Sequence, residues 1–355
     1  MNETAAPSAA IETECVVVGA GPSGLFAVFE LGLLGIKCHV VDSLGHPGGQ
    51  CAELYPDKPI YDIPALPVCG AQELVDRLME QIRPFEAGFH LGQEVTGLRR
   101  RDDGRFELTT ARGTRFDAGA VVIAAGLGSF QPRRLSVDGA EALEGSRLHY
   151  RVARAEQYYG KDLLIAGGGD SALDWVLAFA GRAKSVTLVH RRDEFRAQPA
   201  SVARMKELAA AGQVRHLTGQ VGALEVVDGD LASAVVNCLD GSVARVACDH
   251  VFAFFGLHPK LGPIADWGLE LERKALKVDT EKFQTSVPGI FAIGDINTYP
   301  GKKKLILSGF HEAALAAFGV QAHVYPNKRQ FLQYTTTSPI MQQRLGLAGQ
   351  GDAGG

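Results

Sequence analysis

The chain has 355 residues, enough for two domains, and 46% of them are hydrophobic. Its formal net charge of −4 gives no global basic field, so we expect no nucleic-acid partner. No apolar run reaches the ~18 residues that a membrane span needs, and the residues before Cys15 lack the pattern of a signal peptide. The six cysteines include no CxxC pair. These features predict a cytoplasmic protein with free thiols and no membrane partner.

The first predicted element is an apolar strand over residues 15–18, which leads into the turn GAGPSG and an apolar helix. In this pattern the first glycine makes a tight turn, the second lets the backbone approach a pyrophosphate, and the third lets helix and strand pack. The free N–H groups at the start of the helix then face the phosphates. The predicted contacts of this copy are Gly19, Gly21, Pro22, Ser23 and Gly24.

A second strand in this copy ends at Asp42. A carboxylate at that position accepts hydrogen bonds from ribose hydroxyls and repels a 2′-phosphate. The first copy therefore predicts a site for FAD or NAD. Two chance glycine turns are the alternative, and it is disfavoured because strand, helix and diagnostic residue all stand where the motif requires them.

Between the two copies the chain alternates loops and regular elements. A loop rich in glycine and proline is expected over residues 45–67, and an amphipathic helix over 68–85. Residues 106–126 indicate a hairpin that ends in a buried strand over 121–125. The segment LGSFQPRR then breaks the pattern.

The glycine pattern returns 148 positions later, because Gly167 corresponds to Gly19 and Gly169 to Gly21 (167 − 19 = 169 − 21 = 148). A small alanine replaces the third glycine, which still permits close packing of helix and strand. The predicted contacts of this copy are Gly167, Gly169, Asp170, Ser171 and Ala172.

The second copy differs from the first in charge at the diagnostic position. His190 takes the place of the carboxylate, Arg191 and Arg192 follow it, and Arg196 lies one helical turn further on. Guanidinium groups match phosphate oxygens, and charge-assisted hydrogen bonds contribute about 1.5–3 kcal/mol each. The second copy therefore predicts NADP rather than NAD. A solvated basic loop is the alternative.

The order of the segments predicts an insertion. The second copy ends near residue 256, and the strand–glycine–aspartate element GIFAIGDIN and an apolar helix over 308–325 follow it. We expect an α/β fold of two Rossmann-like, three-layer (ββα) dinucleotide-binding domains. The FAD domain is predicted over residues 1–130 and 258–355, with a C-terminal extension, and the NADPH domain over 131–257.

Several motifs together resemble one family. GAGPSG, GGQCAELYPDKPIYDIPA, VVIAAG, GIFAIGD, GGGDSA and HRRDEFR are similar to those of the low-molecular-weight thioredoxin-reductase-like flavoproteins. GGQCAELYP, SFQPR, GGGDSALDW and FLQYTTTSP bring the resemblance closest to the thioredoxin-reductase-type ferredoxin–NADP(+) reductases. The resemblance covers nearly the whole chain. It implies FAD and NADP(H) as cofactors, a homodimer, and ferredoxin as partner, with flavodoxin as the alternative.

The resemblance also implies particular flavin contacts. Asp42 resembles the residue that binds the FAD ribose, and Asp295 the acid that holds the ribityl chain. Gln50 and Tyr55 resemble residues of the flavin site, where the Tyr55 ring stacks on the isoalloxazine. Tyr334 falls in the C-terminal extension that covers the other flavin face in this family. The remaining implied contacts are Val95, Phe130 and Thr336.

One departure from the disulfide reductases concerns cysteine. A thioredoxin reductase of this shape carries CxxC before the second glycine turn, where this chain has RLHYRVARAEQYYGKDLL. Other flavin disulfide reductases have C-x4-C in the flavin loop, and here Pro56 replaces the second cysteine after Cys51. A dithiol relay needs both sulfurs, so disulfide reduction is disfavoured. Cys51 is interpreted as a small buried side chain, with a reactive thiol as the alternative.

We therefore expect a ferredoxin–NADP(+) reductase that exchanges hydride with NADP(H) and single electrons with ferredoxin. No acid–base residue is assigned, and no metal is expected. For nicotinamide to reach the flavin, either Tyr334 or the two domains must move. Ferredoxins are usually acidic, so the docking surface is expected to be basic. Its candidate residues are Lys302, Lys303, Lys304, Arg133, Arg134, Lys328 and Arg329.

Three alternatives remain open from the sequence. The same bound cofactors could serve a flavodoxin, quinone or ferric reductase, or a diaphorase. A disulfide reductase without its own CxxC would need an external dithiol partner. A module that binds both cofactors and signals redox state without turnover belongs to a different class.

Overall fold

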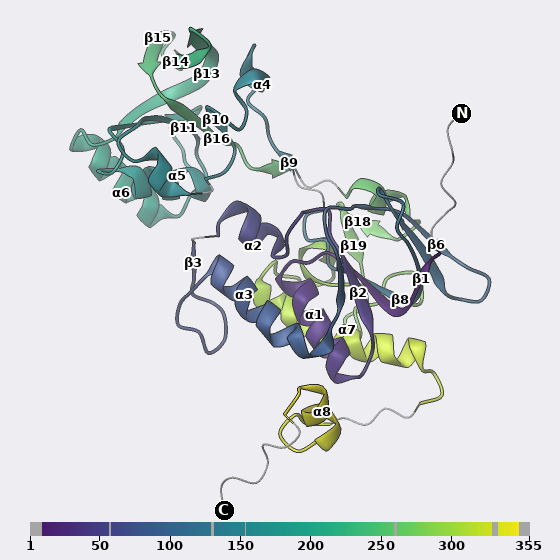
Figure 1. The fold of residues 1–355 in the computed structure, drawn as a ribbon. Helices are drawn as coiled ribbons and strands as arrows, with labels where there is room; N and C mark the ends of the chain where they lie inside the picture. The colour runs from purple at the N-terminus through teal and green to yellow at the C-terminus, as the bar shows by residue number, and fades with distance from the viewer. Residues whose placement is uncertain are drawn as a thin grey trace, which may run out of the picture. The chain divides into compact units, whose positions relative to one another are not determined.

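The computed structural model describes residues 9–56, 58–128, 131–152, 154–258, 261–328 and 333–347. Its contacts divide the chain into two units. Unit 1 comprises Met1–Ser129 and Pro259–Gly355, and unit 2 comprises Phe130–His258, so unit 2 is inserted in the sequence of unit 1 (Figure 1). No described helix is both long and apolar enough to cross a bilayer.

The centre of unit 1 is a parallel sheet in the order β5-β2-β1-β8-β20. The valine and isoleucine runs of its central strands are buried on both faces, as a covered parallel sheet requires. The last strand comes from the C-terminal part of the chain, so the sheet is completed only after the insertion. The strands of this sheet and its extension are β1 (Ile11–Val18), β2 (Cys38–Val41), β5 (Gly88–His90), β6 (Val95–Arg100), β7 (Phe106–Thr110), β8 (Arg115–Ile123) and β20 (Ile290–Ala292).

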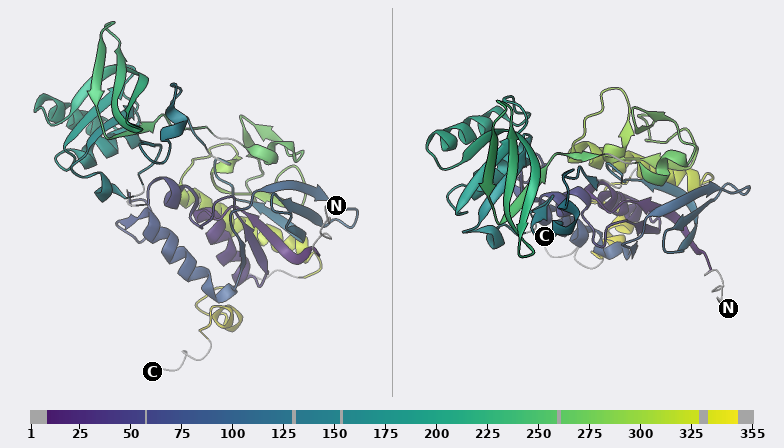
Figure 2. Two further views of the ribbon diagram at one scale, coloured as in Figure 1. Left: turned by 45° about the horizontal axis from the view of Figure 1, so that its top comes forward. Right: turned by 90° about the horizontal axis from the view of Figure 1, so that it is seen from above.

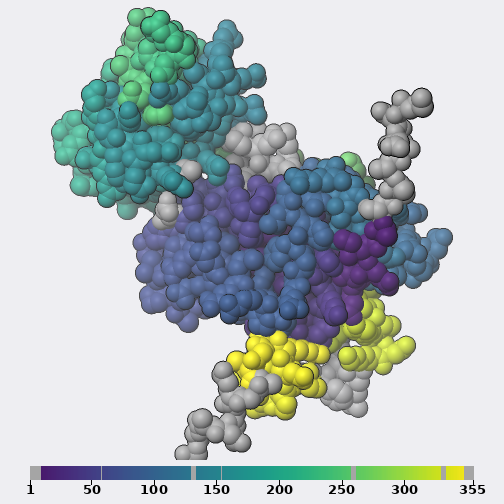
Figure 3. Space-filling view, in the orientation of Figure 1, coloured from purple at the N-terminus to yellow at the C-terminus, as the bar shows by residue number. Residues whose placement is uncertain are grey.

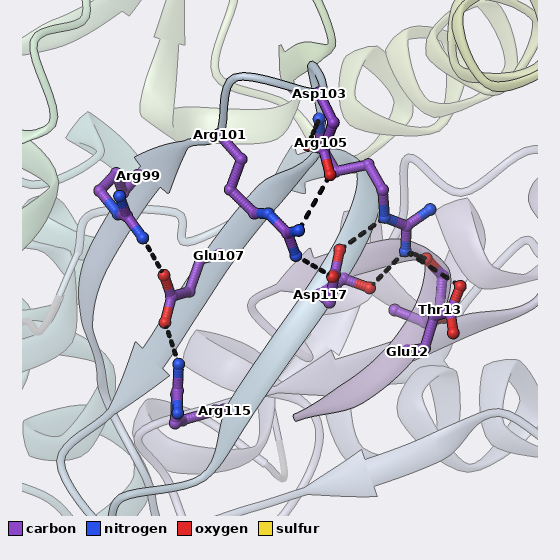
Figure 4. Close-up of polar contacts among 9 residues, drawn as sticks. All are labelled: Glu12, Thr13, Arg99, Arg101, Asp103, Arg105, Glu107, Arg115 and Asp117. Atoms are coloured by element: carbon purple, nitrogen blue, oxygen red, sulfur yellow. Dashed lines mark hydrogen bonds and ion pairs between the residues drawn. The ribbon is translucent and has the colours of Figure 1, made fainter. Parts of the chain in front are cut away.

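The first half of β8 also begins an antiparallel meander with β7 and β6. Arginine and carboxylate side chains tie these strands together (Figure 4). Arg105 donates to Asp117 Oδ1 at 2.5 Å, and Glu107 accepts hydrogen bonds from Arg99 at 2.6 Å and Arg115 at 2.5 Å. These two guanidinium donors lower the pKa of Glu107 to about 2. The expected hairpin is confirmed.

Three helices of unit 1, α1 (Pro22–Leu33), α3 (Ala71–Ile82) and α7 (Ile306–Val324), lie side by side against the sheet (Figure 1). α3 buries Leu74 and Leu78 on one face and carries charged residues on the other. This pattern confirms the predicted amphipathic helix. Because α1 directly follows β1 in the chain, the N-terminus of α1 lies at the carboxyl end of the parallel sheet.

The segment predicted as a loop over residues 45–67 contains a short helix. α2 (Gly49–Leu54) begins after Gly48, whose φ of +116° makes the sharp entry, and GQCAEL has no helix breaker after its first residue. The other short elements of unit 1 are β3 (Pro59–Ile60), β4 (Cys69–Gly70), η1 (Arg83–Phe85), η3 (Gly262–Asp266), β18 (Leu271–Glu272), β19 (Ala275–Lys277), η4 (Gly294–Ile296), β21 (Asn297–Thr298) and α8 (Pro339–Arg344).

α8 docks at the C-terminal end of α1. The Arg344 guanidinium donates to the Leu33 carbonyl at 2.5 Å and lies against Gly35. The Ser338 hydroxyl caps α8 by accepting the Met341 N–H at 3.3 Å. Figure 3 shows this segment, in yellow, against the purple and blue surface of unit 1.

Unit 2 contains a second sheet in the order β10-β16-β11-β12-β13-β14-β15. Its first five strands are parallel, and the last three form an antiparallel ribbon, drawn in green in Figure 2. The expected α/β fold with two Rossmann-like halves is confirmed. The elements of unit 2 are β9 (Gln131–Pro132), α4 (Ala140–Leu143), β10 (Leu148–His149), η2 (Ala155–Tyr158), β11 (Asp162–Gly167), α5 (Asp170–Phe179), β12 (Ser185–His190), α6 (Pro199–Ala210), β13 (Arg215–Val227), β14 (Asp230–Cys238), β15 (Val243–Ala247), β16 (His250–Phe254) and β17 (Leu257–His258).

Candidate functional site

The first glycine turn joins β1 to α1 in unit 1. Gly19 has a φ of +114°, and a Cβ there would lie 2.4 Å from the Ala124 carbonyl oxygen, so only glycine fits. Gly24 is as confined, because its Cβ would lie 2.0 Å from the Gly19 oxygen. Gly21 has an ordinary φ of −72°, and the nearest described atom to its Cβ would be Gly49 Cα at 4.0 Å. The turn is closed toward the protein and open at Gly21.

The start of α1 leaves backbone donors available. No described side chain caps the helix, which begins at Pro22, so the N–H groups of its first turn have no side-chain acceptor. The Ser23 hydroxyl packs inward, since Cβ atoms built on Gly294 and Gly309 would lie 2.9 and 2.1 Å from it. α1, η4 and α7 therefore meet at Ser23, which leaves the backbone of the turn for a ligand.

Asp42 directly follows β2 and is 9% exposed. Its Oδ2 accepts the Ala20 N–H at 2.6 Å, and its Oδ1 accepts the Leu44 N–H at 2.8 Å. Burial raises the pKa of Asp42, and these two N–H donors oppose the rise. The segment before the buried Val95 runs beside it, because the Gln93 N–H donates to the Asp42 carbonyl at 2.9 Å. The carboxylate is thus anchored to the glycine turn, and the start of β6 lies close by.

Gln50, Tyr55 and Asp295 come together although they are distant in sequence. Gln50 and Cys51 lie on α2, Tyr55 ends that helix, and Asp295 lies in η4. Burial raises the pKa of Asp295, and a hydrogen bond from Gln50 is one of the contacts that oppose the rise. A Cβ on Gly126 would lie 3.3 Å from Gln50 Nε2. The Tyr55 hydroxyl lies 3.7 Å from Cys51 Sγ. Burial raises the pKa of Tyr55, and Cys51 and Asp295 raise it further, so the phenol is neutral.

Behind this cluster lies a buried ion pair of Glu312, which the sequence did not single out, and Lys302, to which it gave another role. Glu312 of α7 is fully buried, and it forms an ion pair with Lys302, whose side chain is 7% exposed. The expectation that Lys302 belongs to a docking surface is therefore wrong, whereas Lys303 and Lys304 are exposed. Burial raises the pKa of Asp295, and Lys304 and then Lys302 lower it. A single carboxylate inside the apolar stretch SGFHEAALAA was the available signal.

Tyr334 and Thr336 are not brought to this cluster within one chain. Both lie in the turn before α8, and Tyr334 is 64% exposed. α8 docks at the C-terminal end of α1, whereas the glycine turn precedes its N-terminal end; a helix of this length spans about 18 Å. Phe130 lies outside the described residues.

The other expected docking cations are scattered. Arg133 and Arg134 are exposed in unit 2, where Arg134 pairs with Glu144 at 3.3 Å. Lys328 lies over the Tyr325 ring at 5.1 Å, just beyond the C-terminal end of α7. Arg329 lies outside the described residues.

The second glycine turn in unit 2 repeats the division between closed and open glycines. A Cβ on Gly167 would lie 2.6 Å from the Phe254 carbonyl oxygen, and one on Gly168 would lie 2.1 Å from the His190 ring. Gly169 has a φ of −101°, and a Cβ there would meet no described atom within 4 Å. The open position is again the second glycine of the motif.

The arginine-rich segment folds back over this turn. The Arg196 N–H donates to the Gly168 carbonyl at 2.8 Å, and the Gln198 N–H donates to Asp170 Oδ1 at 2.8 Å. At the start of α5, Ser171 is exposed and Ala172 is buried against the turn. The loop after β12 therefore lies at the start of α5.

Three cations gather around His190 at this place. Burial lowers the pKa of His190, the Glu194 carbonyl raises it, and Arg191, Arg192 and Arg196 lower it further. All three arginines are exposed, and no acidic side chain in the described part of the chain pairs with them. A cluster of unpaired guanidinium groups beside an open glycine turn is suited to a phosphate.

All six cysteines are free. Cys51 is 2% exposed, and burial raises its pKa, which lowers the population of the reactive thiolate. The interpretation of Cys51 as a small buried side chain is confirmed.

The comparisons with known proteins agree with this geometry. The family model described as pyridine nucleotide-disulphide oxidoreductase matches residues 13–317. The ferredoxin–NADP reductase of Methylibium petroleiphilum is 62% identical over 95% of this chain and 93% of its own. Ferredoxin–NADP reductase 2 of Cupriavidus pinatubonensis is 61% identical over 95% of this chain and 92% of its own.

Among solved structures, thioredoxin reductase of Lactococcus lactis in its FR conformation matches with a TM-score of 0.73 and 25% identity. The match covers 88% of this chain and 99% of that one. The chain therefore belongs to the pyridine nucleotide-disulphide oxidoreductase family and, within it, to the ferredoxin–NADP reductases that are built like thioredoxin reductases.

Proposed function

We propose that the chain is an FAD-dependent ferredoxin–NADP(+) oxidoreductase that catalyses NADPH + 2 oxidised ferredoxin ⇌ NADP⁺ + 2 reduced ferredoxin + H⁺. The observation that carries this proposal is the pair of open glycine turns, one beside a carboxylate and the other beside three exposed arginines. The names of relatives about 60% identical over nearly the whole chain support it.

Unit 1 fits FAD. Gly21 leaves room for a pyrophosphate at the N-terminus of α1, and Asp42 is anchored where ribose hydroxyls meet the second strand. Gln50, Tyr55 and Asp295 form one polar and aromatic cluster from two separate segments. These residues would hold the ribityl chain and the ring system. The contacts of Val95, Phe130 and Thr336 belong to the proposal as well.

Unit 2 fits NADP(H). Gly169 leaves room for a pyrophosphate at the start of α5. At Gly167 the turn is instead packed closely, because a Cβ there would meet the Phe254 carbonyl and Ala172. Arg191 and Arg192 supply fixed positive charge beside His190, where a 2′-phosphate would lie. This placement favours the phosphorylated coenzyme because NADH has no 2′-phosphate for these cations to bind.

When bound, the flavin accepts hydride and releases single electrons, which no side chain can do. The protein would bind the cofactor, orient it and shield it from water. The Tyr55 phenol stays neutral and would supply a flat face, while the uncapped N–H groups at the start of α1 would donate to the cofactor. The buried, protonated Cys51 thiol disfavours the alternative of disulfide reduction.

We further propose a homodimer in which the segment with Tyr334 and Thr336 reaches the flavin site of the neighbouring subunit. The support is that α8 docks at the far end of α1 from the glycine turn of its own chain. Sedimentation equilibrium tests the dimer. Mixed dimers of a Tyr334→Ala chain and a Tyr55→Ala chain should retain one intact site.

Ferredoxin is the proposed partner, and flavodoxin is the alternative one. Lys303 and Lys304 are the proposed docking cations, because they are exposed and Lys304 lies close enough to Asp295 to lower its pKa. A cytoplasmic location is proposed from the six free cysteines.

Steady-state turnover with NADPH and with NADH, using ferredoxin coupled to cytochrome c as acceptor, tests the function. We expect a yellow protein, bleached by NADPH and reoxidised by ferredoxin, with NADPH strongly preferred. A colourless protein that cannot be reconstituted with FAD would refute the proposal. Equal turnover with NADH would refute the assignment of unit 2.

A further inference from the structure

A buried hydrogen-bond hub lies behind the proposed flavin cluster of unit 1. Its centre is Glu312, in the second turn of α7 and 0% exposed. Glu312 Oε2 accepts the Gly294 N–H at 2.7 Å and the Asn297 amide at 2.9 Å. Its Oε1 accepts the Tyr299 hydroxyl at 2.9 Å and the Lys302 ammonium. A side chain that accepts from four donors and donates to none is an ionised carboxylate.

Lys302 completes the hub with the opposite charge. Its ammonium donates to Glu312 and to the Gly294 carbonyl at 2.9 Å, and it lies 5.3 Å from the centre of the Tyr299 ring. Removing two charges from water costs several kcal/mol per ion, and a buried pair is weak evidence of stabilisation. The partners of the pair therefore indicate its role better than its energy does.

Those partners hold one residue, Gly294, through the peptide group on each side of it. Gly294 donates its N–H to Glu312 and offers its C=O to Lys302, and that carbonyl belongs to the peptide that leads into Asp295. Gly294 has a φ of +74°, and Ser23 of α1 would lie 2.9 Å from its Cβ. The backbone that presents Asp295 is thus bonded to Glu312 of α7 and lies beside Ser23 of α1.

The two charges also act on the cluster in opposite directions. Burial raises the pKa of Asp295, Lys304 and then Lys302 lower it, and Glu312 raises it. Asp295 therefore lies within the electrostatic reach of both members of the pair. A group bound at Asp295 is exposed to the same two fields, which oppose each other while both charges are present.

We propose that Lys302 and Glu312 are a positioning pair for Asp295, and that the two charges shift the reduction potential of the flavin bound there in opposite directions. This inference rests on the proposed function. Reduction adds negative charge to the cofactor, so a lone Lys302 cation favours the reduced form and a lone Glu312 anion favours the oxidised form. The two single variants must therefore shift the midpoint potential in opposite directions, whereas loss of packing alone has no such sign.

The test compares Glu312→Gln, Lys302→Met and the double variant, each loaded with FAD, by redox titration at pH 8. We expect a rise for Glu312→Gln and a fall for Lys302→Met. Each corresponds to about a tenfold change in the ratio of affinities for reduced and oxidised FAD, or ~30 mV for a two-electron couple. The double variant should have the wild-type midpoint potential. Lys302→Arg, which keeps the positive charge, should have it too.

Asp117→Asn is the matched control, because it breaks the ion pairs of the meander in the same unit (Figure 4). It should lower the melting temperature without moving the potential. Potentials that move in the same direction, or not at all, in the two single variants would overturn the inference. If Glu312→Gln fails to fold, the comparison of Lys302→Met with Lys302→Arg decides the same question. A wild-type chain that binds no FAD would instead overturn the proposed function itself.

Discussion

Gly169→Ala should separate coenzyme binding from folding. The backbone at Gly169 has φ −101° and ψ 180°, which alanine adopts without strain, and the added Cβ meets no described atom within 4 Å. Glycine-to-alanine changes at such positions stabilise proteins by about 0.4–1 kcal/mol through the unfolded state. The melting temperature of unit 2 should therefore stay level or rise.

The methyl group stands where the second glycine of the motif lets a pyrophosphate approach. A phosphate displaced from the start of α5 loses at least one charge-assisted hydrogen bond, worth about 1.5–3 kcal/mol. At ~1.4 kcal/mol per factor of ten, NADP⁺ binding should weaken roughly tenfold to a hundredfold.

Calorimetric titration of the FAD-loaded protein with NADP⁺ measures this loss, and the visible spectrum counts the flavin that is retained. Gly21→Ala is the matched variant, because its φ of −72° and open surroundings are equivalent in unit 1. It should lose FAD and keep NADP⁺ binding. Gly167→Ala should instead destabilise the fold, since its Cβ would lie 2.6 Å from the Phe254 oxygen. A stable Gly169→Ala protein whose dissociation constant stays within about twofold of wild type would refute the reasoning.

Three further predictions concern charge. Replacing Arg191 and Arg192 together by alanine should raise the Michaelis constant for NADPH by about tenfold or more, because each lost contact costs at least ~1.5 kcal/mol. The Michaelis constant for NADH should not change. If the assignment is wrong, kinetics measured with both coenzymes will show equal losses. The pKa of His190 is lowered in the free chain, and a bound 2′-phosphate should raise it, so NADP⁺ affinity should increase as pH falls from the higher pKa toward the lower one. NAD⁺ affinity should not increase in this way. In calorimetric titrations, His190→Asn should remove this difference in pH dependence between NADP⁺ and NAD⁺. Lys303→Glu should raise the Michaelis constant for ferredoxin at low ionic strength, whereas Lys328→Glu, at the other end of α7, should not; identical behaviour of the two variants contradicts the proposed docking surface.

The glycine turns could be predicted from the sequence because their constraints are local. Gly19 and Gly24 are forced by contacts with the adjacent strand and with each other, and such contacts recur wherever a strand–turn–helix unit forms. Asp42 and His190 were likewise placed by counting to the end of the next strand. The charge of Asp42 and the charges of Arg191 and Arg192, which follow His190, then distinguished the two nucleotides before any fold was known.

The flavin cluster needed the whole chain. Gln50 and Asp295 meet only because β20 and η4 return to the first sheet after the inserted unit, and the resemblance to a family, rather than spacing, named them. Tyr334 was expected near the flavin, and its own chain carries it to the other end of α1. The contact proposed for Tyr334 with the flavin site of a neighbouring subunit would leave no periodic trace in a sequence.

Lys302 marks the limit of reading charge from sequence. In PGKKKL three adjacent lysines look equivalent, and solvation is the ordinary state of each. Two nucleotide sites and their preferences could be predicted from the order of residues, because backbone geometry and unit charges are local properties. The packing of the folded chain was needed to show which lysine is buried, because that depends on Glu312 in the next helix, which faces the same turn. Burial is a property of the packed chain, and desolvation converts one of three identical side chains into part of the site.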